Sequence, residues 1–129
     1  MLNKSQILGA VDIVIEKVPT PEWGGDVFVK SLTGAEKDAF EESVVDMSGK
    51  DVKVNMKNAR AKMAAKTICT EKGERLFTDD DIPELGKKNG AVLERVFNVA
   101  QRLSGFGAGE VGKLVKNSKS AQADSSISA

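Results

Sequence analysis

The chain has 129 residues, 19 acidic and 19 basic side chains, and no histidine. This length favours one domain, and a net charge of zero argues against a general nucleic-acid binder, whose affinity comes mainly from basic side chains on phosphates. Without histidine the chain lacks the commonest general base and metal ligand, so we expect no enzyme, no metal and no cofactor.

The single cysteine, Cys69, excludes an intramolecular disulfide and is typical of a reducing compartment. We interpret it as a small apolar side chain, because no histidine is available to activate it as a nucleophile. No apolar run approaches the ~20 residues needed to cross a bilayer, and the first eight residues lack the apolar core of a signal peptide. We therefore expect a soluble cytoplasmic protein that does not bind membranes.

The N-terminal third predicts a β-hairpin over about 11–32. The segments 11–18 and 27–32 are rich in β-branched residues and predict two strands, with Val11, Ile13 and Ile15 on one face of the first. Two prolines and a glycine pair within 19–26 predict the turn between them. A lone hairpin is marginal in water, so we expect it to pack on the helices or join another sheet.

Three positions in the chain have residues typical of a helix N-terminus. Asn3 is a cap for a short helix reaching about Leu8, Thr33 and Glu36 have the spacing of a capping box, and Thr78 precedes three aspartates that suit a helix N-terminus. The longer helices are predicted at about 34–47, 55–69, 79–86 and 91–104.

Apolar residues at helical spacing predict which faces are buried. The stripes are Ala35, Ala39, Phe40, Val44 and Met47 in the first long helix, Met56, Ala59, Met63 and Thr67 in the second, and Val92, Leu93, Val96, Phe97, Ala100 and Leu103 in the last. The last stripe is the most regular, so we expect its helix to be the central core element, with Phe97 nearly fully buried and Gln101 on the outer face.

The composition changes after residue 104. Residues 105–129 are rich in Gly, Ser and Ala, which predicts a flexible tail with a short helix at 110–116 and disorder from Asn117 onward. The predicted fold class is therefore α+β: a mainly α-helical single domain over residues 1–104, with a small N-terminal β-hairpin and a disordered C-terminal tail.

One acidic and one basic cluster could be read as binding sites, but we favour a purely structural interpretation of each. The acids Asp79–Asp81 with Glu84 lack the alternating spacing of a calcium loop and indicate a charged helix start. The basic residues Lys53, Lys57, Arg60, Lys62 and Lys66 have no stacking aromatic residues among them, so a solvated helix face is favoured over a nucleic-acid site.

Trp23 and three methionines are the candidate partner-binding residues. Trp23 is the only tryptophan and lies in a Pro/Gly-rich loop, so it is either a binding hot spot or a cover for the hairpin. Met47, Met56 and Met63 would suit an adaptable groove that accepts helices. Core filling is the favoured alternative for each methionine.

Five segments together resemble the tail assembly chaperones of long-tailed bacteriophages (siphophages). They are Pro21–Val29 with Leu32–Glu41, then Asn58–Ala61, Gly73–Asp81 and Leu93–Gly105. The resemblance lies in their order and spacing, and it covers about residues 1–117.

The resemblance implies a protein that binds the tape measure protein and helps recruit tail tube subunits during tail assembly. It implies no catalytic residues, a place in the host bacterial cytoplasm, and absence from the mature virion. The alternative is a small structural tail or head–tail component of a phage or prophage. Whether the chain associates with itself stays open.

The resemblance also implies a longer form made by programmed ribosomal frameshifting. Gly112-Lys113 and Lys116-Asn117 can each be encoded by slippery codons, so these four residues mark the candidate frameshift positions. They lie in the predicted tail, where a change of sequence would leave the folded domain intact.

Overall fold

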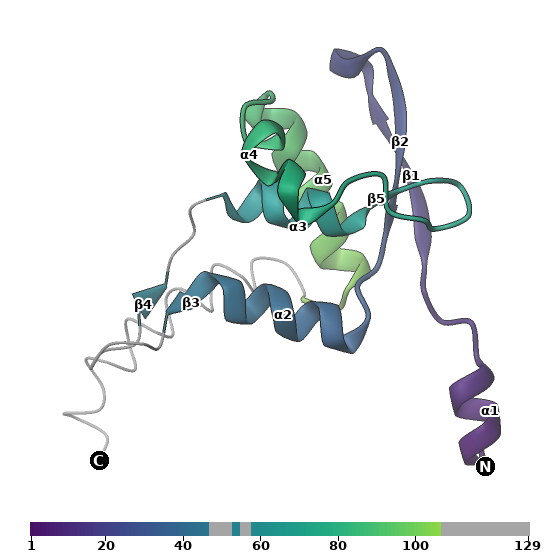
Figure 1. Ribbon diagram of the computed structural model, residues 1–129. Coiled ribbons are helices and arrows are strands. Elements are labelled where there is room, and N and C mark those ends of the chain that lie inside the picture. The colour runs from purple at the N-terminus through teal and green to yellow at the C-terminus, as the bar shows by residue number, and fades with distance from the viewer. Residues whose placement is uncertain (47–52, 55–57, 107–129) are drawn as a thin grey trace.

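The computed structural model describes residues 1–46, 53–54 and 58–106 and confirms the α+β fold class (Figure 1). Its helices are α1 (Lys4–Gly9), α2 (Gly34–Val44), α3 (Ala59–Thr67), α4 (Ile82–Leu85) and α5 (Gly90–Leu103), with two 3-10 turns, η1 (Pro21–Trp23) and η2 (Asp79–Asp81). Its strands are β1 (Ile15–Thr20), β2 (Gly25–Lys30), β3 (Val45–Asp46), β4 (Lys53–Val54) and β5 (Ile68–Cys69). No helix within these described ranges is long and apolar enough to cross a membrane.

The predicted hairpin is present, but its first strand is shifted along the chain. Strands β1 and β2 pair antiparallel from Ile15 opposite Lys30 to Thr20 opposite Gly25. The prediction that the strand begins at Val11 is wrong, and so is the assignment of Pro19 and Thr20 to the turn. Proline is tolerated here because β1 is an edge strand, with β2 as its neighbour.

The hairpin joins a three-stranded sheet through a strand that the sequence did not predict. Strand β5 pairs antiparallel with β2, placing Ile68 opposite Val29 and Cys69 opposite Phe28. The helix predicted to reach Cys69 therefore ends at Thr67, because Ile68 is extended (φ −68°, ψ 125°). Both strand residues are buried, so burial beside β2 decides their conformation.

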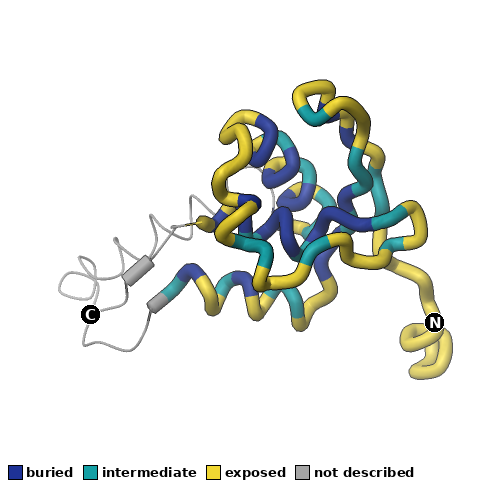
Figure 2. The backbone as a smooth tube through the Cα atoms, turned by 45° about the horizontal axis from the view of Figure 1, so that its top comes forward, coloured by how far each residue is buried: buried dark blue, intermediate teal, exposed yellow. Residues whose placement is uncertain are grey.

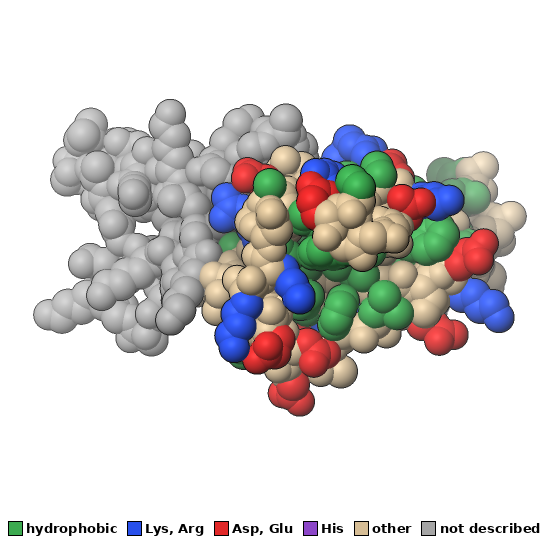
Figure 3. All heavy atoms as spheres, turned by 90° about the horizontal axis from the view of Figure 1, so that it is seen from above, with side chains coloured by type: hydrophobic (Ala, Val, Ile, Leu, Met, Phe, Trp, Pro, Cys, Tyr) green, Lys and Arg blue, Asp and Glu red, His purple; other side chains and the backbone are tan. Residues whose placement is uncertain are grey.

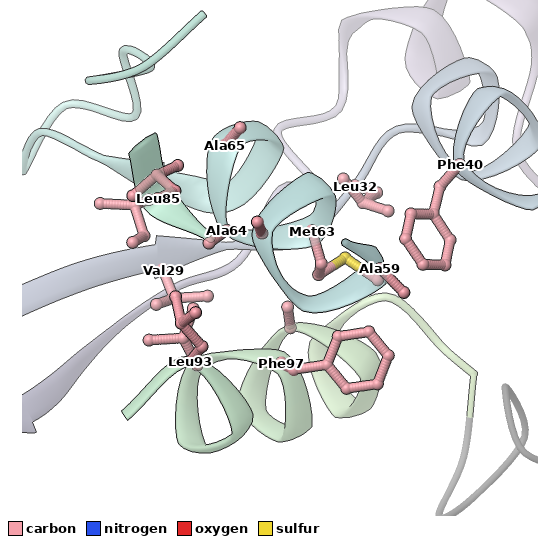
Figure 4. Close-up of a cluster of buried hydrophobic side chains, with 14 of the residues drawn as sticks. Val29, Leu32, Phe40, Ala59, Met63, Ala64, Ala65, Leu85, Leu93 and Phe97 are labelled. Atoms are coloured by element: carbon pink, nitrogen blue, oxygen red, sulfur yellow. The ribbon is translucent and has the colours of Figure 1, made fainter. Parts of the chain in front are cut away.

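The core lies where α2, α3, α5 and the sheet meet. Phe40, Met63 and Phe97 come together from α2, α3 and α5 (Figure 4), and the ring centroids of Phe40 and Phe97 lie 6.3 Å apart. The predicted stripe of α5 is confirmed at Val92, Leu93, Val96, Phe97 and Ala100, whereas Leu103 is half-buried. Gln101, which we expected on the outer face, is buried at the edge of this stripe.

Helix α2 begins where predicted, but its buried face and its end differ from the prediction. Its capping box is confirmed, because the Glu36 amide donates to the Thr33 hydroxyl and the Thr33 amide donates to the Glu36 carboxylate. Phe40 and Val44 are buried, but Ala35 and Ala39 are exposed, so the buried face is rotated from the predicted one. The helix stops at Val44, three residues short of the prediction, because β3 follows it and pairs with β4.

The predicted helix over 79–86 is divided between η2 and α4. The Thr78 amide donates to the Asp81 carboxylate at 2.8 Å, which fixes the start of the turn. Pro83 lies in the first turn of α4, where its missing amide hydrogen breaks no helical bond. The segment is therefore helical where predicted, but its first turn is 3-10.

The C-terminal limit of the described core lies beyond residue 104. Gly105 takes a positive φ of 78°, which turns the chain so that Phe106 is buried. The Phe106 ring packs edge-on against Phe40, with centroids 6.0 Å apart. Met47, Met56, the helix predicted at 110–116 and the frameshift positions Gly112, Lys113, Lys116 and Asn117 lie outside the described residues.

Helix α1 stands apart from this core. Asn3 caps it as predicted, because its side chain accepts from the Gln6 amide while the Gln6 side chain accepts from the Asn3 amide. None of its residues is buried by the described parts of the chain. Figure 2 shows the helix as an exposed turn beyond the foot of the hairpin.

Phe97→Ala should lower the free energy of unfolding by ~3–5 kcal/mol, because a large aromatic side chain leaves a cavity between α2, α3 and α5. Denaturant titration followed by circular dichroism measures this loss. Glu94→Ala, on the exposed side of the same helix, is the matched control and should cost at most about 1 kcal/mol, as for a surface ion pair. A loss below about 1 kcal/mol for Phe97→Ala would contradict the buried position of this ring.

Candidate partner-binding groove

An open groove of about 500 Å³ lies between the end of the hairpin and the η2–α4 segment. We call it the tip groove; its lining residues are Glu22, Trp23, Phe77, Asp81, Glu84, Leu85 and Lys88. Figure 3 looks down on this side of the molecule and shows hydrophobic side chains near the middle, with acidic and basic side chains around them. The tip groove thus combines apolar walls with a charged rim.

The tight turn η1 positions Trp23 at the end of the hairpin. Pro21 opens the turn with its fixed φ, and Gly24 closes it at φ 85° while its amide donates to the Pro21 carbonyl at 3.0 Å. The buried Thr20 hydroxyl donates to the Gly25 carbonyl at 2.6 Å. Local bonding therefore fixes the backbone on both sides of Trp23.

A bidentate ion pair ties the hairpin tip to α5. The two terminal nitrogens of Arg95 donate to the Glu22 carboxylate at 2.9 and 2.8 Å, and one of them also donates to the Pro19 carbonyl. The hydrogen bonds from Arg95, followed by a backbone hydrogen bond, lower the pKa of Glu22 from 4.5 to about 2. Glu22 therefore stays ionised in all but strong acid, and its partner keeps the tip in place.

The opposite wall of the tip groove is fixed to α3. Arg75 donates from Nε to the Ala65 carbonyl at 2.9 Å and from a terminal nitrogen to the Asp79 carboxylate at 3.0 Å. This second bond lowers the pKa of Asp79. Arg75 thereby links α3 to η2, and Phe77 lies in the short segment between Arg75 and Asp79. Leu85 is buried beneath the groove.

The position of Trp23 is compatible with both interpretations that the sequence left open. Its side chain is half-buried and packs against the core, and it also lines the open tip groove. Half-burial leaves part of the indole accessible to a partner at little further cost in ordering. Whether a partner uses it stays a prediction.

Within the described part of the chain, the other candidate residues lie away from the tip groove or in the core. Met63 is fully buried between helices and has no accessible surface to offer. In the basic cluster, Arg60 pairs with Glu94 at 3.7 Å and Lys62 donates to the Ser43 carbonyl at 3.0 Å. Cys69 is buried in β5, and burial raises the pKa of its thiol.

The tip groove has the chemistry of a binding surface. Among the described residues, no group of three or more Cys, Asp or Glu side chains could hold a metal ion. What the groove offers is an aromatic and aliphatic surface on Trp23, Phe77 and Leu85, with more acids than bases at its rim. A short apolar helix with basic flanking residues has the complementary chemistry.

Sequence reasoning found Trp23 but not its neighbours. Phe77 and Leu85 belong to segments that are too short for a recognisable apolar period, so no pattern pointed to them. Glu22 and Arg95 are 73 residues apart, and single-sequence patterns carry no signal for such a pair. The sequence shows that the charged residue Glu22 precedes Trp23, but it does not show that Arg95 pairs with it.

Comparison with known proteins identifies relatives of the whole chain. A family model described as "Phage tail assembly chaperone" matches residues 13–122. Among solved structures, the chain is similar to one titled "Structure of bacteriophage HK97 tail assembly chaperone", with a TM-score of 0.55 and 19% sequence identity. The match covers 77% of this chain and 90% of that chain, and at this identity it shows a shared fold. No curated protein sequence matches the chain.

The Glu22–Arg95 pair predicts an acid-sensitive contribution to stability. Because folding lowers the pKa of Glu22 from 4.5 to about 2, this contribution is fully present above pH 4.5 and is lost as the pH falls toward 2. Wild type should therefore be more stable than Glu22→Gln at pH 6, and the difference in free energy of unfolding should shrink between pH 4.5 and pH 2. Denaturant titrations at a series of pH values measure it.

Glu71→Gln provides the control for this titration, because Glu71 is exposed and has no salt bridge among the described residues. It should follow wild type at each pH. A difference between wild type and Glu22→Gln that does not change with pH would show that the carboxylate makes no special contact in the folded protein.

Proposed function

Because the chain belongs to the phage tail assembly chaperone family, we propose that it binds an apolar helical segment of the tape measure protein in the tip groove. The family's role, assisting tail assembly, is not a catalytic one. The proposal adds a specific client and a specific surface to that role. Its support comes from the groove's chemistry and from the kind of surface that a long helical client exposes.

The tip groove is the observation that carries the proposal. A tape measure protein is a long helical chain with apolar seams, and an unassembled seam needs a surface that covers it. Trp23, Phe77 and Leu85 supply such a surface on the described part of the chain, and their walls are fixed by Arg95 and Arg75. Each apolar client side chain that becomes fully buried there contributes ~1.5–3 kcal/mol.

We further propose that the chaperone helps to recruit tail tube subunits to the client. A minority product with an extension beyond this fold would carry a second binding module next to the first. Linking two modules raises the effective concentration of one partner near the other without a new contact. The described core ends at Phe106, before the candidate frameshift positions, so both products would share the whole tip groove.

The proposal includes a place of action: the host bacterial cytoplasm during assembly, and not the mature virion. A structural tail or head–tail component, the alternative from the sequence, would remain in the particle. Mass spectrometry of purified virions separates the two roles. Peptides of this chain at a constant ratio to tube subunits would identify a structural component.

Trp23→Ala should reduce co-purification of the tape measure protein without unfolding the chaperone. The substitution removes the largest apolar surface at the hairpin tip while the Glu22–Arg95 pair still fixes the backbone. Co-expression followed by affinity purification, with the ratio of the two proteins measured on gels, gives the result. We expect a loss of at least about tenfold, as for an aromatic hot spot.

Leu76→Ala is the matched control, because Leu76 is exposed, apolar and adjacent to Phe77, but lies outside the groove lining. It should leave co-purification unchanged. If Trp23→Ala keeps its circular dichroism spectrum and also retains the client at the wild-type ratio, Trp23 is not part of the contact surface.

The longer product should diverge from this chain at Gly112-Lys113 or Lys116-Asn117. The gene should carry a slippery heptamer at one of these dipeptides, and expression with the downstream region should give an extended protein with the same N-terminal peptides. Intact mass spectrometry detects it. Synonymous codons that destroy the heptamer form the control and should abolish the extension. Absence of both heptamer and extended product would refute frameshifting here.

A further inference from the structure

The hairpin loses its third strand before it reaches the tip groove. Within the described part of the chain, β5 pairs with β2 at Phe28 and Val29, so from Val27 outward the hairpin has two strands. Figure 1 shows this end extending beyond β5. A two-stranded ribbon is marginally stable in water. The Lys17–Asp26 ion pair joins the two strands to each other and not to the helices. The hairpin end therefore needs contacts with other elements to keep one position.

Arg95 makes the polar contacts that join this end to α5. Its terminal nitrogens donate to both carboxylate oxygens of Glu22, and one of them also donates to the Pro19 carbonyl at 3.1 Å. The two charged side chains are 36% and 35% exposed, whereas each other ion pair of the described residues has a partner that is more than half exposed. Bidentate geometry fixes direction as well as distance. Arg95 therefore fixes the residue that directly precedes Trp23.

Arg95 acts on the tip groove from outside it. Glu22 and Trp23 line the groove, but Arg95 does not. The short turn η1, with Pro21 at its start and Gly24 at its end, leaves the Trp23 backbone little freedom once Glu22 is held. A substitution at Arg95 thus leaves the apolar walls chemically unchanged and alters only how firmly one of them is placed.

We propose that Arg95 is a positioning residue, which sets the affinity of the tip groove for its client by holding Trp23 in place before the client arrives. This role rests on the proposed function, which supplies the client. It adds the residue that prepares the surface. A client that binds an ordered surface does not have to order it, so less conformational entropy is lost on binding.

The size and the kinetic form of the effect follow from this mechanism. Without Arg95, only those molecules whose hairpin end is in place can bind, and the apparent affinity falls by that fraction. An unsupported two-stranded end that is in place in about a tenth to a half of the molecules weakens binding about two- to tenfold. The association rate carries this loss. The dissociation rate is unchanged, because the bound client contacts the same side chains.

The charge of Arg95 acts in the opposite direction. Removing it leaves the Glu22 carboxylate unpaired at a rim that already has more acids than bases. A client with basic flanking residues would be attracted more strongly to such a rim. Weaker binding after loss of Arg95 therefore reports positioning and not the loss of an attractive charge.

The first experiment measures the order of the hairpin end without any client. Trp23 is the only tryptophan and tyrosine is absent, so emission above the phenylalanine range reports this position alone. Arg95→Gln should lower the fluorescence anisotropy of Trp23 and increase its quenching by acrylamide, while the far-ultraviolet circular dichroism stays that of wild type. Unchanged anisotropy and quenching would overturn the inference.

Arg102→Gln is the matched control for this measurement. It removes the bond from the same helix to Glu16 of the same hairpin. Glu16 lies opposite Val29, where β5 supports the sheet as a third strand. The control should therefore leave the anisotropy and quenching of Trp23 at their wild-type values.

Binding rates distinguish positioning from direct contact. The probe is an immobilised synthetic peptide that copies an apolar helical segment of the tape measure protein. Arg95→Gln should slow association about two- to tenfold and leave the dissociation rate unchanged, whereas Trp23→Ala removes a contact and should mainly accelerate dissociation. Arg95→Lys keeps the charge but lacks the planar fork, so it should also slow association. A change confined to the dissociation rate of Arg95→Gln would make Arg95 a contact residue and overturn the inference.

A double-mutant cycle tests whether Arg95 acts through Trp23. In the Trp23→Ala background, Arg95→Gln should weaken peptide binding by less than about twofold, because no indole is left to position. An equal loss in both backgrounds would overturn the inference. If wild type binds the peptide and Arg95→Gln binds it equally well, the inference fails and the proposed function stands. A wild type that does not bind the peptide would refute the proposed client and this role of Arg95 together, whatever the anisotropy of Trp23.

Discussion

Arg95 and Arg102 lie about two turns apart on α5, on the same side of the helix, and reach along the hairpin to Glu22 and Glu16. A two-stranded hairpin is marginal by itself, so this support decides whether its outer end is ordered. The apolar face of α5 packs in the core while its arginines hold the hairpin from the flank. At the foot, the Leu32 amide donates to the Ser104 hydroxyl at 2.9 Å. One helix thus fixes the hairpin from tip to foot.

The tip groove depends on the same arrangement, because its two walls come from different parts of the chain. The hairpin tip is fixed to α5 by Arg95, and the Phe77 wall is fixed to α3 by Arg75. Since α3 and α5 pack together in the core, the spacing between the walls follows from that helix pair. The apolar stripe of α5 thus stabilises the core, and Arg95 on its surface positions one wall of the groove. The position of the groove wall at η1 is therefore fixed by contacts with α5, although η1 itself is only a short turn.

Local signals predicted most of the fold, and the errors occur where tertiary contacts override them. The cap at Asn3, the capping box at Thr33 and the stripe of α5 depend on neighbouring residues, and the structure confirms them. Ile68 and Cys69 continue a helical pattern, but pairing with β2 makes them a strand. Phe106 follows a glycine in a segment that looked flexible, and the pocket beside Phe40 buries it. The candidate site was predictable only at Trp23, because the rest of the groove depends on contacts between distant residues.

The distance in sequence between the partners of the hairpin has a consequence for the order of events during synthesis. The hairpin is synthesised first. Glu22 can pair with Arg95 only after 73 further residues have been made, and Leu32 can bond to Ser104 only after 72. Contacts this distant form late, after the loop between them has been closed. The tip groove can therefore mature only after α5 has left the ribosome. A nascent chain therefore has a complete tip groove only when nearly all of the described core has been made, so the proposed client could not be captured by a half-made chain.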